Sequence, residues 1–191
     1  MKRRLSIRRW VQLAALAAMA LAVCAFLFRG DLRDLLVDDT RFSTEIAAAA
    51  ARHNLPPELV RAVVFQESRF DPFARGSRGE YGLMQVLPQG AAAEWARVLR
   101  RPVPGRAELC TPQVNLEIGC WYLARAMERW KKYRCRTELA LCQYNAGESR
   151  AERWKPETPD GEVIDRIGIG STRIYVQRIM RRYRSYLEEG L

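Results

Sequence analysis

Residues 56–88, PPELVRAVVFQESRFDPFARGSRGEYGLMQVLP, contain the pattern that decides the fold. Over residues 56–69 the apolar side chains recur at spacings of three and four, which predicts a helix. Proline is tolerated at its start because the first turn needs no backbone donors. Residues 71–81 concentrate proline, glycine, serine and charge, which predicts a loop. A helical pattern resumes over residues 83–99, with an interruption near Pro88.

The remainder of the chain beyond residue 43 has the same helical spacing, and no segment alternates strictly between apolar and polar residues as a half-buried strand does. Further helices are predicted over residues 44–52, 113–132, 137–146 and 172–187. The apolar stripe of the helix over 113–132 is typical of a surface that faces a core. We therefore predict one all-α globular domain over residues 44–191.

The N-terminus carries a separate signal. Residues 10–28 are mostly Ala, Leu and Val, and these 19 residues are just long enough to cross a bilayer as a helix. Five basic residues precede them, so the positive-inside rule keeps residues 1–9 in the cytoplasm as a basic tail and exports the rest. The predicted fold is thus an all-α domain preceded by one N-terminal transmembrane helix, the signal anchor, with a juxtamembrane linker over 29–43. A cleaved signal peptide is the alternative, because residues 23–25 (VCA) resemble a cleavage site.

The net charge of +10 comes largely from this N-terminal segment. Six of the 32 Lys and Arg residues lie in the first 29 positions, where there is no acidic residue, which leaves +4 for residues 30–191. A mildly basic domain without a nucleic-acid-binding motif gives no reason to expect DNA or RNA as a partner.

Four cysteines follow the N-terminal segment, namely Cys110, Cys120, Cys135 and Cys142. Their even number in an exported domain predicts disulfide bonds. An alternative is that Cys120 and Cys142, which lie in apolar helical patterns, are small buried hydrophobic residues. There is no C-x-x-C pair and His53 is the single histidine, so we expect neither a metal site nor a cofactor.

Glu67 is the first candidate for catalysis. On a helix its neighbours one turn away include Val63, Val64 and Phe70, so its carboxyl lies among apolar side chains. Burial disfavours the charged form and raises the pKa of a carboxyl. A glutamate that holds a proton near neutral pH suits the cleavage of a glycosidic bond, because the leaving oxygen must be protonated. A glutamate beside valines is more often an ordinary boundary residue, so the position of Glu67 on the helix does not by itself assign it a function.

Five short motifs follow one another along the chain, and their order makes the assignment of Glu67 as a catalytic residue more specific. In chain order they are Glu67-Ser68-x-Phe70-x-Pro72-x-Ala74, Gly79-x-x-Gly82-Leu83-Met84-Gln85-x-x-Pro88, Asn115-x-x-x-Gly119-x-x-Tyr122-Leu123, Gln143-Tyr144-Asn145-Ala146-Gly147 and Thr172-x-x-Tyr175-Val176. This succession resembles the soluble lytic transglycosylase family of lysozyme-like enzymes. The resemblance covers about residues 44–187 and makes the region 44–191 the expected catalytic domain.

The resemblance implies a role for each matched residue. Glu67 would be the single catalytic acid/base, and Tyr175 a supporting residue from the last helix. The other substrate-binding candidates are Ser68, Ser77, Glu80, Gly82, Leu83, Met84, Gln85, Tyr144 and Asn145. Among these, Gly82 to Gln85 would shape the cleft floor, and Tyr144 and Asn145 would line the site beside the cleaved bond. Tyr144 and Asn145 also have a purely structural interpretation, as a core aromatic and an amide at a helix end.

Two positions depart from the family pattern. The family commonly has Ser, two residues, Gly and Ala before the Gly-Leu-Met-Gln run, whereas this chain has Gly76 at the Ser position, Ser77 one step later and Glu80 in place of Ala. The hydrogen bond that the family serine would make to the substrate is therefore in question. Glu80 is either a solvated loop residue or a polar group turned into the cleft.

The resemblance also implies the substrate and the reaction. The substrate would be the glycan strands of peptidoglycan, cleaved at the β-1,4 bond between N-acetylmuramic acid (MurNAc) and N-acetylglucosamine (GlcNAc). No second carboxylate stands in a recognisable motif, so the N-acetyl group of MurNAc would assist bond cleavage and its C6 hydroxyl would attack C1, which leaves a 1,6-anhydro end.

Two other functions stay open. In a lysozyme-like hydrolase (a muramidase), Glu80 or Asp71 would hold a nucleophilic water. The other is a non-catalytic wall-binding component of a secretion apparatus.

By the predicted topology the domain lies in the periplasm of a bacterium and is held at the inner membrane by residues 10–28. The sequence contains no signal that identifies a cell-envelope machinery as its partner.

Overall fold

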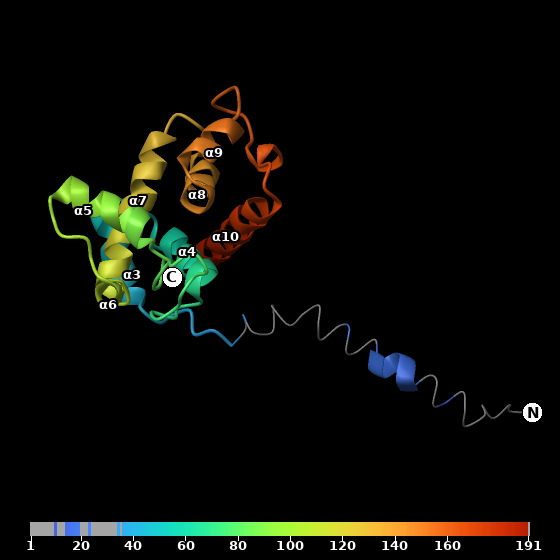
Figure 1. Ribbon diagram of the computed structural model, residues 1–191. Coiled ribbons are helices and arrows are strands. Elements are labelled where there is room, and N and C mark those ends of the chain that lie inside the picture. The colour runs from blue at the N-terminus through green and yellow to red at the C-terminus, as the bar shows by residue number, and fades with distance from the viewer. Residues whose placement is uncertain (1–9, 11–13, 20–22, 24–33, 35, 191) are drawn as a thin grey trace, which may run out of the picture. The chain divides into compact units, whose positions relative to one another are not determined.

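The structure is a computed structural model that describes residues 10, 14–19, 23, 34 and 36–190. The chain divides into two compact units, residues 1–38 and 39–191, and the helical domain is the second. The domain's elements are α3 (Ser43–Arg52), α4 (Pro57–Ser68), η1 (Pro88–Ala92), α5 (Ala93–Leu99), α6 (Arg106–Leu109), α7 (Pro112–Arg129), α8 (Arg136–Ala146), α9 (Glu148–Trp154), η2 (Ile164–Arg166) and α10 (Gly170–Glu189). Among the described residues, extended pairing is limited to isolated bridges from Tyr81 to Arg75 and Val86. The domain is all-helical (Figure 1).

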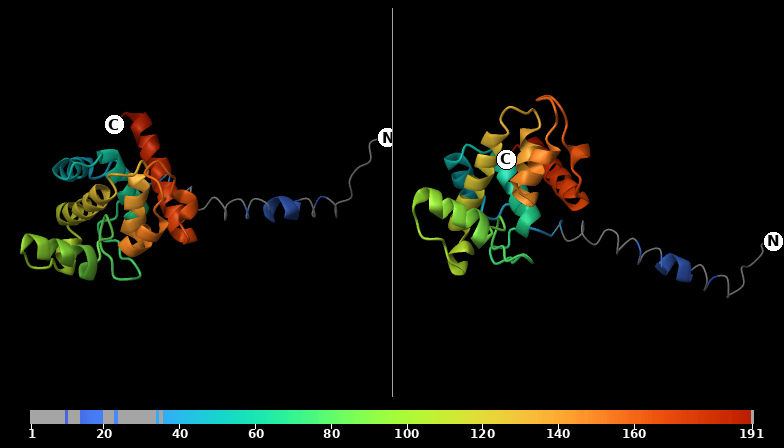
Figure 2. Two further views of the ribbon diagram at one scale, coloured as in Figure 1. Left: turned by 90° about the horizontal axis from the view of Figure 1, so that it is seen from above. Right: turned by 45° about the horizontal axis from the view of Figure 1, so that its top comes forward.

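Helix α4 is the central element of the domain. Its residues 59–65 are all buried, and six of these seven are apolar, which is expected for a helix that lies inside a core. It packs against α10 and α3, and the views in Figure 2 show it between these two helices. The burial of α4 fixes its last turn, which carries Glu67, against the remainder of the domain.

A buried arginine in α4 joins both ends of the domain. Nε and one Nη of Arg61 donate hydrogen bonds of 2.9 Å each to the backbone and side chain of Asp39. The guanidinium also lies over the ring of Tyr186, 3.9 Å from its centroid, and the Tyr186 hydroxyl donates to Asp39 at 2.7 Å. Because Asp39 begins the compact unit and Tyr186 lies near the end of α10, this cluster ties both ends of the domain to α4.

The segment between α4 and η1 is held by one buried side chain, Asn115 of α7. Its Oδ1 accepts a 2.7 Å hydrogen bond from the backbone N–H of Met84, and its Nδ2 donates to the carbonyl oxygens of Tyr81 and Leu109, both at 2.7 Å. Gly82 lies between these anchor points with a φ of +77°, and a Cβ there would collide with Asn115. The turn therefore requires glycine for both conformation and space.

The helix predicted over residues 83–99 begins later than expected. Residues 83–87 are non-helical, and helical structure starts at Pro88. The backbone N–H of Met84 is bonded to Asn115, and Gln85 adopts a φ of +48°, so these residues cannot continue an α-helical ladder. Helix α9, the short α6 and η2 were not predicted, whereas the remaining expected helices are present within a few residues of their predicted ends.

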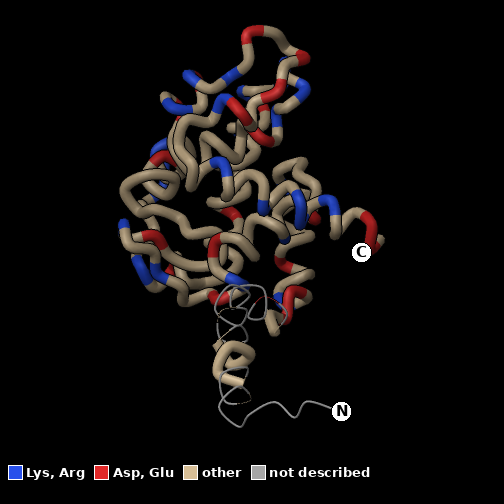
Figure 3. Tube along the Cα trace, turned by 90° about the vertical axis from the view of Figure 1, so that its right-hand side faces the viewer, with Lys and Arg blue, Asp and Glu red and all other residues tan. Residues whose placement is uncertain are grey.

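Charged residues of both signs are interspersed along the domain (Figure 3). Several of them pair on its surface, as Arg129 does with Glu148 at 3.1 Å and Glu152 at 3.4 Å. Exposed pairs of this kind contribute little to stability. The fold therefore depends on its apolar core and on the buried contacts of Arg61 and Asn115.

The transmembrane helix expected over residues 10–28 is the part of the predicted fold class that is wrong. In the part of the chain that the structure describes, no helix has the length and apolar character needed to cross a membrane. A span needs about 20 consecutive apolar residues, and the longest described run in this stretch is residues 14–19. Apart from residues 10, 14–19 and 23, the stretch lies outside the described residues, as does the basic tail over residues 1–9.

The predicted disulfides are also absent from the described domain, where Cys110, Cys120, Cys135 and Cys142 are free. Cys120 lies in α7 and its thiol contacts the Met84 sulfur at 3.9 Å. Cys135 and Cys142 lie at the start of α8 and two turns along it, a separation of about 10 Å that exceeds the reach of a disulfide. The alternative interpretation, small buried hydrophobic residues, agrees with the full burial of Cys120 and Cys142.

We expect Asn115→Ala to lower the free energy of unfolding by about 3 kcal/mol, because it leaves the buried N–H of Met84 and two carbonyl groups without partners. Urea denaturation followed by circular dichroism measures the change. Gln113→Ala, an exposed position on the same helix, is the control and should change the value by less than about 0.5 kcal/mol. Equal effects of the two substitutions would contradict the anchoring role of Asn115.

Candidate active site

Glu67 lies in the last turn of α4, just before Arg69 and Phe70, which both have positive φ. Its Oε1 accepts a 2.6 Å hydrogen bond from the hydroxyl of Tyr175 in α10. Burial raises the pKa of Glu67 to about 7, the Tyr175 hydrogen bond acts in the opposite direction, and the negative charge of Glu80 adds to the rise. The carboxyl therefore exchanges its proton near neutral pH, as an acid/base catalyst must.

The raised pKa also has a cost. The folded state holds the Glu67 proton more tightly than the unfolded chain, where the pKa is near 4.5. Glu67 therefore stabilises the fold fully only below that value, and this contribution is lost as the pH rises through about 7. A carboxyl kept in such a place despite this cost is a candidate for function.

Tyr144 of α8 lies close enough to Glu67 for the carboxylate charge to raise the pKa of its hydroxyl. Its hydroxyl donates a 2.8 Å hydrogen bond to the Met84 carbonyl oxygen, and its ring meets that of Tyr122 edge to face, with centroids 5.7 Å apart. Burial raises the pKa of Tyr144, and the negative charge of Glu67 raises it further. The tyrosine therefore stays neutral and remains a hydrogen-bond donor to the loop.

The residues of the Gly-Leu-Met-Gln run act mostly through their backbone. Leu83 and Met84 are fully buried, and their carbonyl oxygens accept hydrogen bonds from the hydroxyls of Ser68, at 2.9 Å, and Tyr144. The Gln85 amide donates to the Gly82 carbonyl oxygen at 2.9 Å. Ser68 therefore holds the loop in place, and it is not among the residues that line the pocket.

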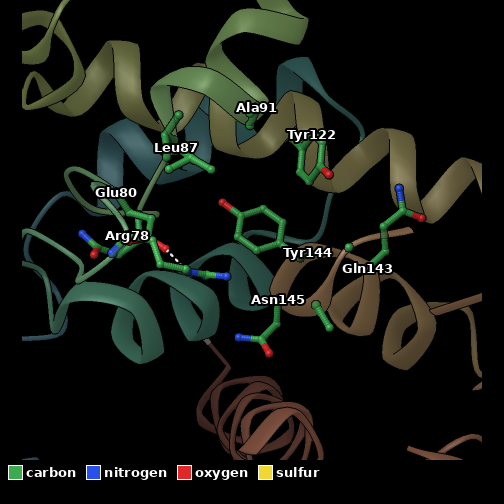
Figure 4. A pocket seen from close by; sticks show the side chains of 13 residues that line it. Arg78, Glu80, Leu87, Ala91, Tyr122, Gln143, Tyr144 and Asn145 are labelled. Carbon is green, nitrogen blue, oxygen red and sulfur yellow. Dashed lines mark hydrogen bonds and ion pairs between the residues drawn. The ribbon is translucent and has the colours of Figure 1, made fainter. Parts of the chain in front are cut away.

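A pocket of about 240 Å³ opens between this loop, η1, α7 and α8. Four of the residues singled out from the sequence line it, namely Glu80, Gln85, Tyr144 and Asn145, and Figure 4 shows Tyr144 and Asn145 facing this space. The others (Glu67, Ser68, Ser77, Gly82, Leu83, Met84 and Tyr175) are not part of its lining. Glu67 nevertheless lies near the lining, because its charge raises the pKa of Tyr144, and the charges of Glu80 and Arg78 act on its own pKa.

Asn145 is fixed from one side only. Its Oδ1 accepts a 2.8 Å hydrogen bond from the Thr172 hydroxyl of α10, and its Nδ2 has no partner among the described residues. An amide donor that is fixed in orientation and unoccupied at a pocket wall suits the binding of a polar ligand.

Glu80 is turned inward, and its side chain is only 10% exposed. Its two oxygens accept hydrogen bonds from Nε of Arg78, at 2.7 Å, and from the Arg78 backbone N–H, at 2.9 Å. Burial by itself would raise the pKa of Glu80, but backbone hydrogen bonds and the Arg78 charge outweigh it and lower the pKa. Glu80 is therefore ionised at neutral pH.

Glu80 also explains the glycine at position 76. A Cβ on Gly76 would collide with the Glu80 carboxylate and would lie 2.8 Å from the Gln85 Oε1 atom. The carboxylate thus occupies the space that a serine side chain at position 76 would need. Ser77, the neighbouring serine, is exposed and does not take that place.

Three other polar residues line the pocket without having been singled out, namely Arg78, Tyr122 and Gln143. Tyr122 and Gln143 belong to motifs that the sequence displays, so a signal was present. Arg78 belongs to no motif, and its place is set by the turn over residues 76–80. The described residues contain no cluster of three or more His, Cys, Asp or Glu side chains that could hold a metal ion.

The all-helical fold and the site around Glu67 together are those of a lysozyme-like domain. The chain belongs to the transglycosylase SLT domain family, whose model matches residues 44–166.

Among similar proteins, the membrane-bound lytic murein transglycosylase E of Buchnera aphidicola is 32% identical over 80 residues, which cover 41% of this chain and 36% of the relative. The soluble lytic murein transglycosylase of Escherichia coli K12 is 28% identical over 134 residues, which cover 66% of this chain and 20% of the relative. The chain thus spans well under half the length of these relatives.

Solved structures share the fold. The lytic transglycosylase Slt of Pseudomonas aeruginosa, in an inactive mutant with Gln in place of Glu, aligns with a TM-score of 0.69 and 28% identity over 78% of this chain and 24% of its own. A complex of the 70-kDa soluble lytic transglycosylase with bulgecin A aligns with a TM-score of 0.66 over 85% of this chain and 29% of its own. At 22% identity, this second likeness concerns the fold alone.

We expect Tyr175→Phe to raise the pKa of Glu67 further above 7, because the lost hydrogen bond favours the charged carboxylate. Titration of the Glu67 carboxyl by carbon-13 NMR measures the shift. Tyr122→Phe is the matched control, since the Tyr122 hydroxyl makes no hydrogen bond to Glu67, and should leave the titration unchanged. A pKa that falls in Tyr175→Phe would contradict this assignment.

Proposed function

We propose that this chain is a peptidoglycan lytic transglycosylase that cleaves the β-1,4 bond between MurNAc and GlcNAc, with Glu67 as the single acid/base. The observation that carries the proposal is the Glu67 carboxyl, which accepts a 2.6 Å hydrogen bond from Tyr175 and lies near the residues that line the pocket, where burial raises its pKa to about 7. Membership of the family and the names of its relatives support the same activity.

The reaction needs one group that first gives and then takes a proton. Protonated Glu67 donates its proton to the glycosidic oxygen, and that bond breaks while the N-acetyl group of MurNAc assists at C1. The Glu67 carboxylate, stabilised by the Tyr175 hydroxyl, then accepts the proton of the C6 hydroxyl, whose oxygen attacks C1. Intramolecular attack gains from an effective concentration on the order of 10⁵ M for well-placed groups, and it closes the 1,6-anhydro ring.

The surroundings of the other two carboxylates favour this route over a hydrolase. Glu80 has both of its oxygens bonded to Arg78. Asp71 is exposed, and its Oδ1 accepts a 2.9 Å hydrogen bond from the backbone N–H of Phe73. Glu80 is thus engaged by Arg78, and Asp71 does not line the pocket, so neither carboxylate is placed to activate a water there.

The substrate-binding part of the proposal follows the lining of the pocket. Glu80, Gln85, Tyr144 and Asn145 would face the glycan directly. The loop residues Gly82, Leu83 and Met84 would contribute backbone shape, Ser68 would hold that loop, and Ser77 would meet the substrate only outside the pocket. Residues 44–191 would form the catalytic domain, working in the periplasm, where the murein named in its relatives lies.

For Glu67→Gln we expect the cleavage of purified sacculi by the full-length protein to fall by about 10³-fold or more, since the amide cannot donate and retrieve a proton. Release of soluble muropeptides measures the rate, and circular dichroism verifies an unchanged helical content. Glu58→Gln, at the other end of the same helix, should retain the activity. Substantial cleavage by folded Glu67→Gln would rule out its role.

The released fragments are expected to end in 1,6-anhydro-MurNAc and to be lighter by one water molecule than fragments with reducing ends. Intramolecular attack by the C6 hydroxyl loses no atoms to solvent, whereas hydrolysis adds a water at C1. Mass spectrometry of the muropeptides distinguishes the two. Reducing ends as the main product would favour the hydrolase, and an intact sacculus with tight glycan binding would favour the non-catalytic wall-binding component.

A further inference from the structure

Arg78 is presented to the pocket by Glu80. Nε of Arg78 is bonded to a buried carboxylate oxygen of Glu80, while the arginine side chain itself is 69% exposed. Within the part of the chain that the structure describes, its Nη groups have no partner. Figure 4 shows the side chain running past Glu80 toward the space that Tyr144 and Asn145 also face.

The pair keeps the arginine in one orientation. Glu80 is itself held by the Arg78 backbone N–H and fills the space beside Gly76, so its position does not depend on a ligand. A guanidinium bound through Nε can still offer two parallel Nη–H donors, which is the geometry that matches a carboxylate. Such preorganisation lowers the entropic cost of binding.

The opposite wall of the pocket supplies a second donor. The Nδ2 of Asn145 is oriented by the Thr172 contact and has no partner among the described residues. Tyr144, which precedes Asn145 in the chain and also lines the pocket, remains neutral because its pKa is raised. Glu80 compensates the charge of Arg78, but the unpaired Nη–H groups on one side and the Asn145 amide on the other still offer donors to an acceptor group between them, and a carboxylate accepts hydrogen bonds most strongly.

We propose that Arg78, positioned by Glu80, forms a carboxylate-binding subsite of the pocket that binds an acidic group of the glycan substrate. This inference rests on the proposed function. In peptidoglycan the carboxylate has two sources: the lactyl group of MurNAc where the stem peptide has been removed, and the stem peptide itself where it is present. GlcNAc units carry neither, so the subsite distinguishes muramic acid strands from chitin.

The test uses the full-length protein with Glu67→Gln, in which glycans bind without being cleaved, with and without Arg78→Gln. Three probes are titrated by calorimetry: a chitin hexasaccharide, glycan strands freed of stem peptides, and strands with stem peptides intact. Arg78→Gln should weaken at least one carboxylate-bearing strand by about tenfold and change chitin binding by less than about twofold. The strand that loses affinity identifies the source of the carboxylate.

Arg75→Gln is the matched control, because Arg75 is an exposed arginine in the same loop and does not line the pocket. It should leave all three affinities unchanged. The tenfold loss should shrink at about 1 M salt, where exposed charges are screened. An equal loss for chitin and for murein strands, or a loss below about twofold for both murein strands, overturns the subsite alone. Failure of every glycan to bind overturns the proposed function as well.

Discussion

The buried amide of Asn115 is the interaction on which the geometry of the site depends. It accepts from the Met84 backbone and donates to the carbonyl groups of Tyr81 and Leu109, which fixes the loop after α4 to helix α7. The hydroxyls of Ser68 and Tyr144 then bind the carbonyl groups of that loop. Helices α4, α7 and α8 are thus joined through one short stretch of irregular backbone, and this stretch is where the pocket opens.

Glu67 gains its chemical character from the same arrangement. The helix that carries it is buried over most of its length, so its last turn emerges among core residues and the carboxyl is poorly solvated. Tyr175 provides one hydrogen bond in compensation, which keeps the pKa near 7 and prevents a larger rise. A carboxyl whose pKa is close to the ambient pH can both donate a proton and accept one within a catalytic cycle.

The loop over residues 76–80 shows how a departure from a family pattern can remain consistent with a working site. A glycine replaces the expected serine, and the carboxylate of Glu80 fills the vacated space. That carboxylate would be costly to bury alone, but Arg78 neutralises it through side chain and backbone. The exchange replaces a neutral hydroxyl by an ion pair and brings a guanidinium into the pocket.

The sequence by itself determined the all-helical class of the domain, most helix positions and the choice of Glu67 as the candidate acid/base. These features depend on local signals: apolar spacing, proline and glycine at helix ends, and a motif order that resembles one family. It could not determine that residues 83–87 are non-helical, because the bond from Asn115 that redirects them comes from 31 residues away.

Only the tertiary structure decided the contacts that depend on distance in space. It placed Arg78 at the pocket, turned Glu80 inward and left the four cysteines of the domain free. It also contradicted the expected transmembrane helix, since no helix among the described residues suffices to span a membrane. The position of Arg78, the orientation of Glu80 and the free cysteines share one physical reason. The number of thiols, or a charge in a loop, does not specify where a side chain points, and side-chain direction decides which groups come into contact.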